Sequence, residues 1–270
     1  MSLISQLGLA FVLSALIAGI ARWRRSLTNS GAIGALISGT AIFGFGGWAW
    51  GIILGFFFVS STVLSHFKEN EKKIVAEKFE KGHQRDLGQV IANGGLATVL
   101  AIFSFFFESP IWLALFVGAM ATVTADTWAT ELGTLSKQPP RLITTGKPVP
   151  VGTSGGISLF GTAVSLLGGL AVGLIAGLTT SATIWQVLLM GGFGGLAGSL
   201  FDSLLGATVQ AVYYSDERKK ETEKKVNPQG IPNQHIRGWL WMTNDLVNLF
   251  ASIFGGIVSL LIRFQTMRLV

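Results

Sequence analysis

The chain has 270 residues, half of them hydrophobic and only 13% charged, which excludes an ordinary soluble domain. Its net charge of +6 would indicate nucleic-acid binding in a soluble protein. Here the basic residues lie between long apolar stretches, so we expect no nucleic-acid partner and a single integral membrane domain over residues 1–270.

Apolar stretches long enough to cross a hydrocarbon core of roughly 30 Å follow one another along the chain. We predict eight membrane-spanning helices, at residues 2–20, 28–46, 48–66, 88–107, 110–133, 155–178, 185–213 and 241–262. Only Gly46, Gly47 and Trp48 separate the second span from the third, so a count of seven stays open. The expected fold class is an all-α bundle of transmembrane helices.

The basic residues predict the orientation of this bundle. Eighteen of the twenty follow the first, third, fifth and seventh spans. Under the positive-inside rule these four loops are cytosolic and both termini lie outside, in a bacterial-type plasma membrane. Loop 67–87 mixes Lys with Glu, which is typical of either a cytosolic amphipathic helix or a solvated linker.

The loop after the fifth span has a different composition. It contains four prolines within 134–154 and leads into a glycine-rich run that opens the sixth span. Free N–H groups and the helix dipole at a helix N-terminus favour an anion. With Arg141 and Lys147 just upstream, the run predicts a phosphate-binding loop made of Gly152, Thr153, Ser154, Gly155 and Gly156.

Polar side chains inside the spans form stripes on four helices. Ionisable groups are costly in a membrane, and those retained usually face the bundle interior at a functional site. At about 100° per residue, the polar residues of each helix fall on one face. The stripes contain Asn93 in the fourth span, Asp126 and Glu131 in the fifth, Asp202 in the seventh, and Asn244, Asp245 and Asn248 in the eighth.

All four stripes lie at a similar depth near the predicted cytosolic face, so we expect one shared site. Three or four carboxylates with amide and hydroxyl oxygens suit a hard cation such as Mg²⁺. Mg²⁺ is usually held by one or two carboxylates together with substrate phosphates, and nearby Lys and Arg would balance the remaining phosphate charge.

Four segments carry a resemblance to a known family: TADTWATELG, PVPVGTSGGIS, GSLFDSLLGATVQ and NDLVNL. In that order they resemble a widespread membrane-protein family long described as a domain of unknown function, which includes a mammalian transmembrane protein and a plastid phytyl-phosphate kinase. The resemblance covers about residues 5–265. The Asp-Thr and Asp-Ser blocks also look, more distantly, like those of CTP-dependent dolichol and phytol kinases and of phosphatidate cytidylyltransferases.

The resemblance implies a membrane kinase that transfers a phosphoryl group from a nucleoside triphosphate, CTP or a related nucleotide, to an isoprenoid monophosphate. Asp126, Glu131 and Asp202 would hold Mg²⁺, with Asp245 as a further candidate. The phosphates would bind Arg141, Lys147 and the 152–156 loop, whereas Asn93, Asn244 and Asn248 would orient the nucleotide or the acceptor. The catalytic residues would be Asp126, Asp202 and Lys147.

Two other functions stay open. The Asp126 and Asp202 blocks can be interpreted as a weak internal repeat, which is typical of a secondary transporter or flippase for a phosphorylated lipid or an ion. A non-catalytic scaffold is a further alternative. The abundant glycines indicate close helix packing, either within one subunit or between subunits of a homo-oligomer.

Overall fold

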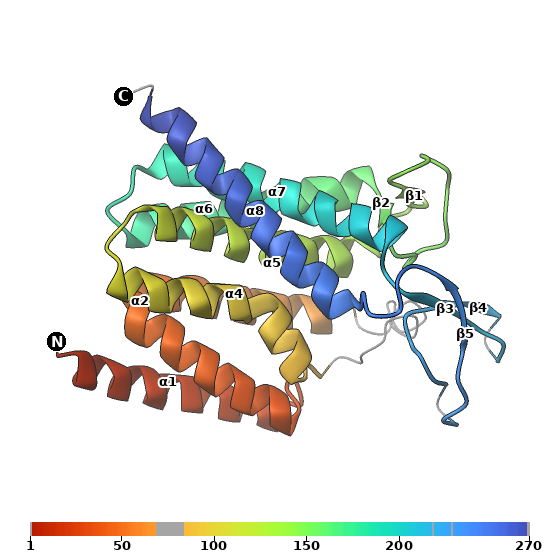
Figure 1. Ribbon diagram of the computed structural model, residues 1–270, viewed down its shortest axis with the longest axis horizontal. Helices are drawn as coiled ribbons and strands as arrows, with labels where there is room; N and C mark the ends of the chain where they lie inside the picture. Colours follow the sequence, from red (N-terminus) through yellow and green to blue (C-terminus); the bar gives the residue numbers. More distant parts are fainter. Residues whose placement is uncertain (1, 69–83, 218, 228, 269–270) are drawn as a thin grey trace.

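The computed structural model describes residues 2–68, 84–217, 219–227 and 229–268 (Figure 1). Within these ranges, seven helices are long and apolar enough to cross a membrane, which confirms the predicted all-α membrane bundle. They are α1 (Leu3–Trp23), α2 (Asn29–His66), α4 (Leu87–Phe106), α5 (Ile111–Gly133), α6 (Leu159–Thr179), α7 (Ile184–Thr208) and α8 (Asn244–Met267).

The longest helix, α2, changes direction at Gly47. This residue has φ of 80° and ψ of −170°, a backbone conformation that belongs to no helix and that glycine adopts without a side-chain clash. Upstream of it, the first half of α2 runs alongside α4. Thr28 at its start donates its backbone N–H to Arg85, just before α4, and Phe45 near its end contacts the ring of Phe105 at a centroid distance of 5.4 Å.

The second half of α2 runs alongside α5. Trp50 stacks on Phe116 near the beginning of α5, at a centroid distance of 3.9 Å. Ser65, at the other end, donates to Glu131 near the end of α5, at 2.8 Å. Because α4 and α5 are consecutive and antiparallel, the two halves of α2 also run in opposite directions. Counted over the described residues, the helices therefore make eight passes through the bundle, and the second and third are divided at the point that the sequence predicted.

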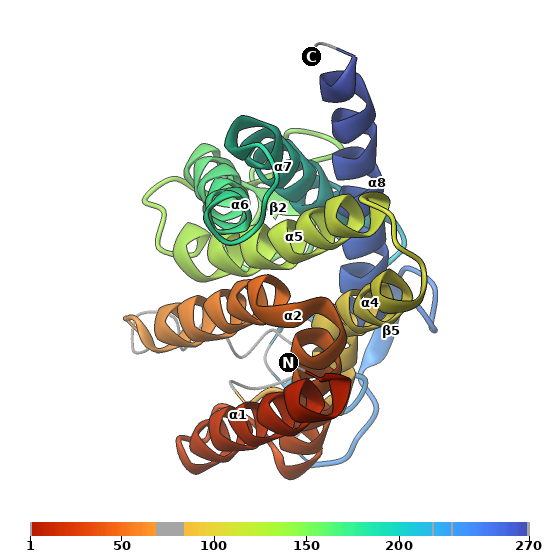
Figure 2. The same cartoon turned by 90° about the vertical axis from the view of Figure 1, so that its left-hand side faces the viewer.

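Helix α5 forms the centre of the bundle (Figure 2). It contacts α2, α4, α6, α7 and α8, and all but one of its residues from Ala114 to Ala125 are buried. Helix α1, in contrast, packs mainly on α2 and leaves much of its surface to the surroundings. The polar end of α5 is thus surrounded by other helices, where an ionisable side chain can be shielded from lipid.

The short strands gather at one end of the bundle, and α1 begins and α8 ends at the other (Figure 1). Strands β1 (Arg141–Leu142) and β2 (Gly156–Ile157) pair antiparallel, and β3 (Val212–Ser215) lies between β4 (Lys220–Thr222) and β5 (Gln234–Arg237). This is the end that the basic loops predict to be cytosolic. The alternatives for loop 67–87 concern residues 69–83, which lie outside the described residues.

Three predicted span boundaries were wrong by four residues or more, one of them the end of the eighth span, since α8 continues to Met267 and not to residue 262. The sixth helix begins at Leu159 and not at residue 155, because Gly156 and Ile157 pair with β1 and Ser158 then caps the helix. The seventh ends at Thr208 and not at residue 213. Beyond it the backbone pairs with the segment that precedes α8, and the β-branched and aromatic residues that follow form β3.

Candidate functional site

A polar cavity of about 320 Å³ opens at the end of the bundle that carries the strands. Its walls come from α2, α4, α5, α6, α7 and α8 and from the loop that precedes α6. The structure thus brings together residues that are more than 150 positions apart in the sequence. The predicted site residues that line it are Asn93, Asp126, Glu131, Gly152, Thr153, Ser154, Gly155, Gly156, Asp202, Asn244, Asp245 and Asn248.

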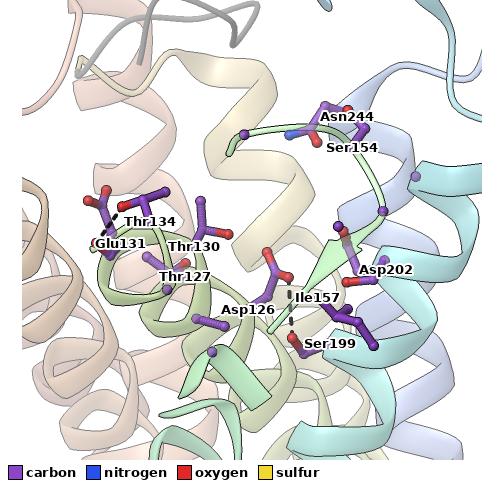
Figure 3. A pocket seen from close by; sticks show the side chains of 18 of the residues that line it. Asp126, Thr127, Thr130, Glu131, Thr134, Ser154, Ile157, Ser199, Asp202 and Asn244 are labelled. Carbon is purple, nitrogen blue, oxygen red and sulfur yellow. Dashed lines mark hydrogen bonds between the residues drawn. The ribbon is translucent and has the colours of Figure 1, made fainter. Parts of the chain in front are cut away.

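Asp126 on α5 and Asp202 on α7 point into the same part of this cavity (Figure 3). Ser199, one turn before Asp202, donates its hydroxyl to Oδ1 of Asp126 at 3.4 Å. The Oδ2 atom of Asp202 is buried and has no hydrogen-bond partner among the described residues. Since Asp202 also experiences repulsion from Asp126, the pair would be stabilised by a bound cation or a donor group.

Glu131 lies apart from this pair (Figure 3). Its Oε1 accepts a hydrogen bond from Ser65 of α2, and its charge acts on Arg85. Across the described ranges of the chain, no three His, Cys, Asp or Glu side chains are grouped so that they could hold a metal ion. The predicted set of three or four carboxylate ligands is therefore not assembled, and the two aspartates remain as the carboxylate pair.

Arg85 is a cationic residue of the cavity that the sequence analysis assigned only to a basic loop. Its guanidinium lies 5.8 Å from the ring centroids of both Phe57 and Phe58. Burial lowers the pKa of Arg85, and the charge of Glu131 opposes this change. Arg85 thus places a half-buried positive charge at the wall of the cavity.

A local sequence signal could have located Arg85. Asp86 and Gln89 form a capping box: the Asp86 carboxylate accepts from the Gln89 backbone at 2.9 Å, and the Gln89 side chain accepts from the Asp86 backbone at 3.3 Å. An acidic residue followed by Gln three positions later, before an apolar run, marks a helix start. Arg85 is therefore held immediately before α4, beside the polar stripe that contains Asn93.

Arg141 and Lys147 do not line the cavity. Both side chains are exposed, and Arg141 donates to the backbone carbonyl of Gly146 at 2.9 Å. The Lys147 carbonyl accepts from the backbone N–H of Leu142. These contacts close a small turn on the outer side of the loop. The two residues predicted to bind phosphate are therefore near the glycine run in sequence but not at the cavity wall.

The 152–156 segment lies over the cavity as a turn and is not the first turn of α6. Gly152 and Gly155 have φ of 78° and 84°, a region that favours glycine. Gly155 also packs directly against Ala207 of α7, where a Cβ atom would overlap the backbone. This close approach fixes the segment on α7. The N–H groups of Thr153 and Gly156 and the Thr153 hydroxyl donate within the loop, so the N–H groups left for a ligand are those of Gly152, Ser154 and Gly155.

Among the described residues, two charged side chains near the three-stranded sheet, Glu223 and Arg237, hold the 152–156 segment in place. Glu223 accepts from the Ser154 hydroxyl at 3.0 Å and from the Gln210 side chain at 2.7 Å. Arg237 donates to the carbonyls of Ser154 and Gly206. Glu223 and Gln210 also line the cavity. The sequence alone indicates no role for Glu223 or Arg237, because their hydrogen bonds to Ser154 depend on the fold of the small sheet.

Comparison with known proteins gives relatives over nearly the whole chain. Protein PGR of Arabidopsis thaliana is 37% identical over 268 residues, covering 90% of this chain and 91% of that protein. An uncharacterized membrane protein of Methanocaldococcus jannaschii is 36% identical over 239 residues, covering 88% and 86%. Protein VTE6, chloroplastic, of Arabidopsis thaliana is 28% identical over 247 residues, covering 88% and 65%.

No solved structure matches the chain. The family described as integral membrane protein DUF92 matches residues 12–256, which include every residue that lines the cavity. That match spans far more than half of the chain. The chain therefore belongs to the DUF92 family of integral membrane proteins.

Proposed function

We propose that this protein is a membrane phosphotransferase that converts an isoprenoid monophosphate into the diphosphate, with a nucleoside triphosphate as the donor. The observation that carries the proposal is the Asp126–Asp202 pair inside a polar cavity at the end of the bundle, with a buried oxygen that no described residue hydrogen-bonds. An uncompensated carboxylate in a membrane is costly, so a bound cation or ligand accounts for its retention.

The donor set fits Mg²⁺. Two carboxylates together with substrate phosphates are the usual way in which proteins hold this ion, and hydroxyl groups are available at Ser199 and Ser203. When bound, Mg²⁺ would neutralise phosphate charge during transfer. The residues proposed to hold it are Asp126 and Asp202, whereas Glu131 acts through its interaction with Arg85.

Phosphoryl transfer requires mainly in-line positioning and charge neutralisation. An oxygen of the acceptor monophosphate attacks the γ-phosphorus of the nucleotide. The bond from that phosphorus to its bridging oxygen breaks, and the nucleoside diphosphate leaves. Arg85 and the N–H groups of Gly152, Ser154 and Gly155 are the groups proposed to bind phosphate oxygens, which leaves Arg141 and Lys147 outside the reaction.

The acceptor and the donor are inferred from the resemblance of the chain to the family of plastid phytyl-phosphate kinase and, distantly, to CTP-dependent lipid kinases. The similarity to Protein VTE6, chloroplastic, supports the same class of reaction. CTP is the donor we propose first. The positive-inside rule supports a cavity that faces the cytosol, where nucleotides are available.

The test uses the full chain, purified and reconstituted in lipid nanodiscs, with Mg²⁺, labelled CTP or ATP, and a panel of prenyl monophosphates. We expect prenyl diphosphate as the product. Asp202→Asn should lower turnover on the order of 100-fold or more. Asp216→Asn is the matched control, because Asp216 is an exposed residue that follows β3 and lies outside the cavity.

Absence of diphosphate across the panel would contradict the proposal, as would an Asp202→Asn variant with wild-type turnover. Flux of a lipid phosphate through proteoliposomes, without any diphosphate formed, would instead support the transporter alternative.

A further inference from the structure

A second cavity, of about 210 Å³, lies between α1, the two halves of α2 and α4. Its lining is almost entirely apolar and includes Leu13, Phe43, Leu54 and Phe58. Three residues on its rim, Ile17, Trp48 and Ile52, are between 45% and 56% exposed, so the cavity opens toward the surroundings of the bundle. We call it the apolar groove.

The apolar groove continues into the polar cavity. Arg85, Gln89 and Asn93 line both. Gln89 and Asn93 lie one turn apart on α4, and Arg85 immediately precedes that helix. The guanidinium of Arg85 lies close to the rings of Phe57 and Phe58, which both belong to the groove. A positive charge therefore stands at the junction of an apolar space and a polar one.

Two glycines show that the groove contains unfilled space. Gly55 on α2 and Gly94 on α4 both line it, and a Cβ atom added at either would meet no heavy atom within 4 Å. Gly94 is buried all the same. Protein interiors are closely packed, and an apolar space of this kind stays free of water and can take up an apolar ligand or a lipid chain.

We propose that the apolar groove binds the isoprenoid chain of the acceptor while its monophosphate binds Arg85 at the junction. This inference rests on the proposed phosphotransferase function and assigns the acceptor subsite. A single-chain amphiphile with an anionic head complements both the charge at the junction and the apolar lining. The head would then lie beside the Asp126–Asp202 pair, and the far end of the chain would leave past Ile17 and Ile52 into the bilayer.

The test fills the groove without touching the polar cavity. Gly55→Leu places a side chain in the unfilled space, and Gly94→Leu does so from the opposite helix. Gly19→Leu is the matched control, because Gly19 lies on α1, does not line the groove and also has open space around its Cβ position. With geranylgeranyl monophosphate as the acceptor, we expect KM to rise about tenfold or more in both groove variants and to stay unchanged in the control.

Chain length provides the readout that a merely unstable variant would not give. Dimethylallyl monophosphate is too short to fill the groove, so Gly55→Leu should raise the KM for geranylgeranyl monophosphate much more than the KM for dimethylallyl monophosphate. Equal KM values for the long acceptor in Gly55→Leu, Gly94→Leu and wild type would overturn the assignment, even if the protein is a kinase.

A binding measurement separates this inference from the proposed reaction. A geranylgeranyl monophosphate with a photoreactive group at the end of its chain should label α1 or α2 in nanodiscs, and Gly55→Leu should reduce that labelling. Labelling of α1 or α2 without turnover of any nucleotide would contradict the proposed reaction but support the groove as a binding site. Turnover together with labelling of other helices would support the reaction but contradict the groove as the acceptor site.

Discussion

At the scale of single residues, Asp202 has a buried carboxylate oxygen that finds no hydrogen-bond partner in the described part of the chain, and it lies beside a second carboxylate. Each added charge in such a place destabilises the fold unless a cation compensates it. The sequence predicted both aspartates as site residues, because ionisable groups inside spans usually face the bundle interior and both lie on polar helix faces at a similar depth.

Metal binding at this pair can be measured without catalysis. Mg²⁺ should raise the melting temperature of the wild-type protein in nanodiscs, because a ligand that binds only the folded state at 100 times its Kd adds about 2.7 kcal/mol. Asp126→Asn and Asp202→Asn should lose this increase, whereas Asp216→Asn should keep it. An equal increase in all four proteins would mean that the cation binds elsewhere.

Arg85 and Arg141 allow a comparison between a cation in the cavity and one outside it. Arg85→Gln should lower kcat/KM for the lipid phosphate by roughly 10- to 100-fold, since a hydrogen bond to a charged group contributes about 1.5–3 kcal/mol. Arg141→Gln should change it less than twofold. The Arg85 backbone keeps its bonds to Ser26 and Thr28 in the variant, so the start of α4 should be retained. A loss in Arg141→Gln as large as in Arg85→Gln would contradict the assignment.

These two arginines also show why the phosphate-binding residue could not be predicted from the sequence. Arg141 lies close to the glycine run along the chain, and proximity in sequence favoured it as the phosphate ligand. In the fold, the turn closed between Leu142 and Lys147 keeps it on the outer side. Arg85 is distant in sequence, but it reaches the cavity because α4 and α5 lie side by side.

At the scale of elements, the small residues of α6 and α7 let the two helices approach backbone to backbone. A Cβ atom at Gly191 would lie 2.5 Å from the carbonyl oxygen of Gly169 and 2.7 Å from the nitrogen of Gly173. Of the two arrangements that the glycine content allowed, packing within one chain accounts for this pair. The contact fixes α7, which carries Asp202, against α6.

Gly191→Ala should therefore lower stability, because neither backbone can move away without separating the helices. Overpacking of this kind costs roughly 1–3 kcal/mol. Gly19→Ala is the control, since its Cβ would meet nothing within 4 Å. Thermal unfolding in detergent should show a lower melting temperature for Gly191→Ala only. Equal melting temperatures in the two variants would show that the helices tolerate the added methyl group.

The length of each apolar stretch was enough to predict that a helix forms there. It was not enough to predict where α6 begins or where α7 ends. The end of α7 and the start of α6 depend on pairings such as Arg141 with Ile157, which join strands on either side of a loop. Apolar length carries no information about such pairings. The reversal in α2, in contrast, was detectable because Gly47 interrupts a stretch too long for a single crossing.

At the scale of the whole molecule, the start of α1 and the end of α8 lie at one end of the bundle, and the polar cavity lies at the opposite end, where the strands are (Figure 1). The described residues of the basic loops lie at the cavity end, among them Arg85, Arg141 and Arg237. The orientation of the bundle thus decides whether the cavity meets cytosolic nucleotide. It follows from the distribution of charge and not from the fold itself.

Orientation can be measured by labelling single cysteines, because the chain contains none. Ser181→Cys lies in the exposed turn between α6 and α7, and Thr144→Cys lies in the exposed loop at the cavity end. In intact cells that express the protein, a membrane-impermeant maleimide should label the first and not the second. Permeabilised cells should give labelling of both, which controls for accessibility. The opposite pattern in intact cells would place the cavity outside and remove cytosolic CTP as the donor, while labelling of both would contradict the eight-pass arrangement.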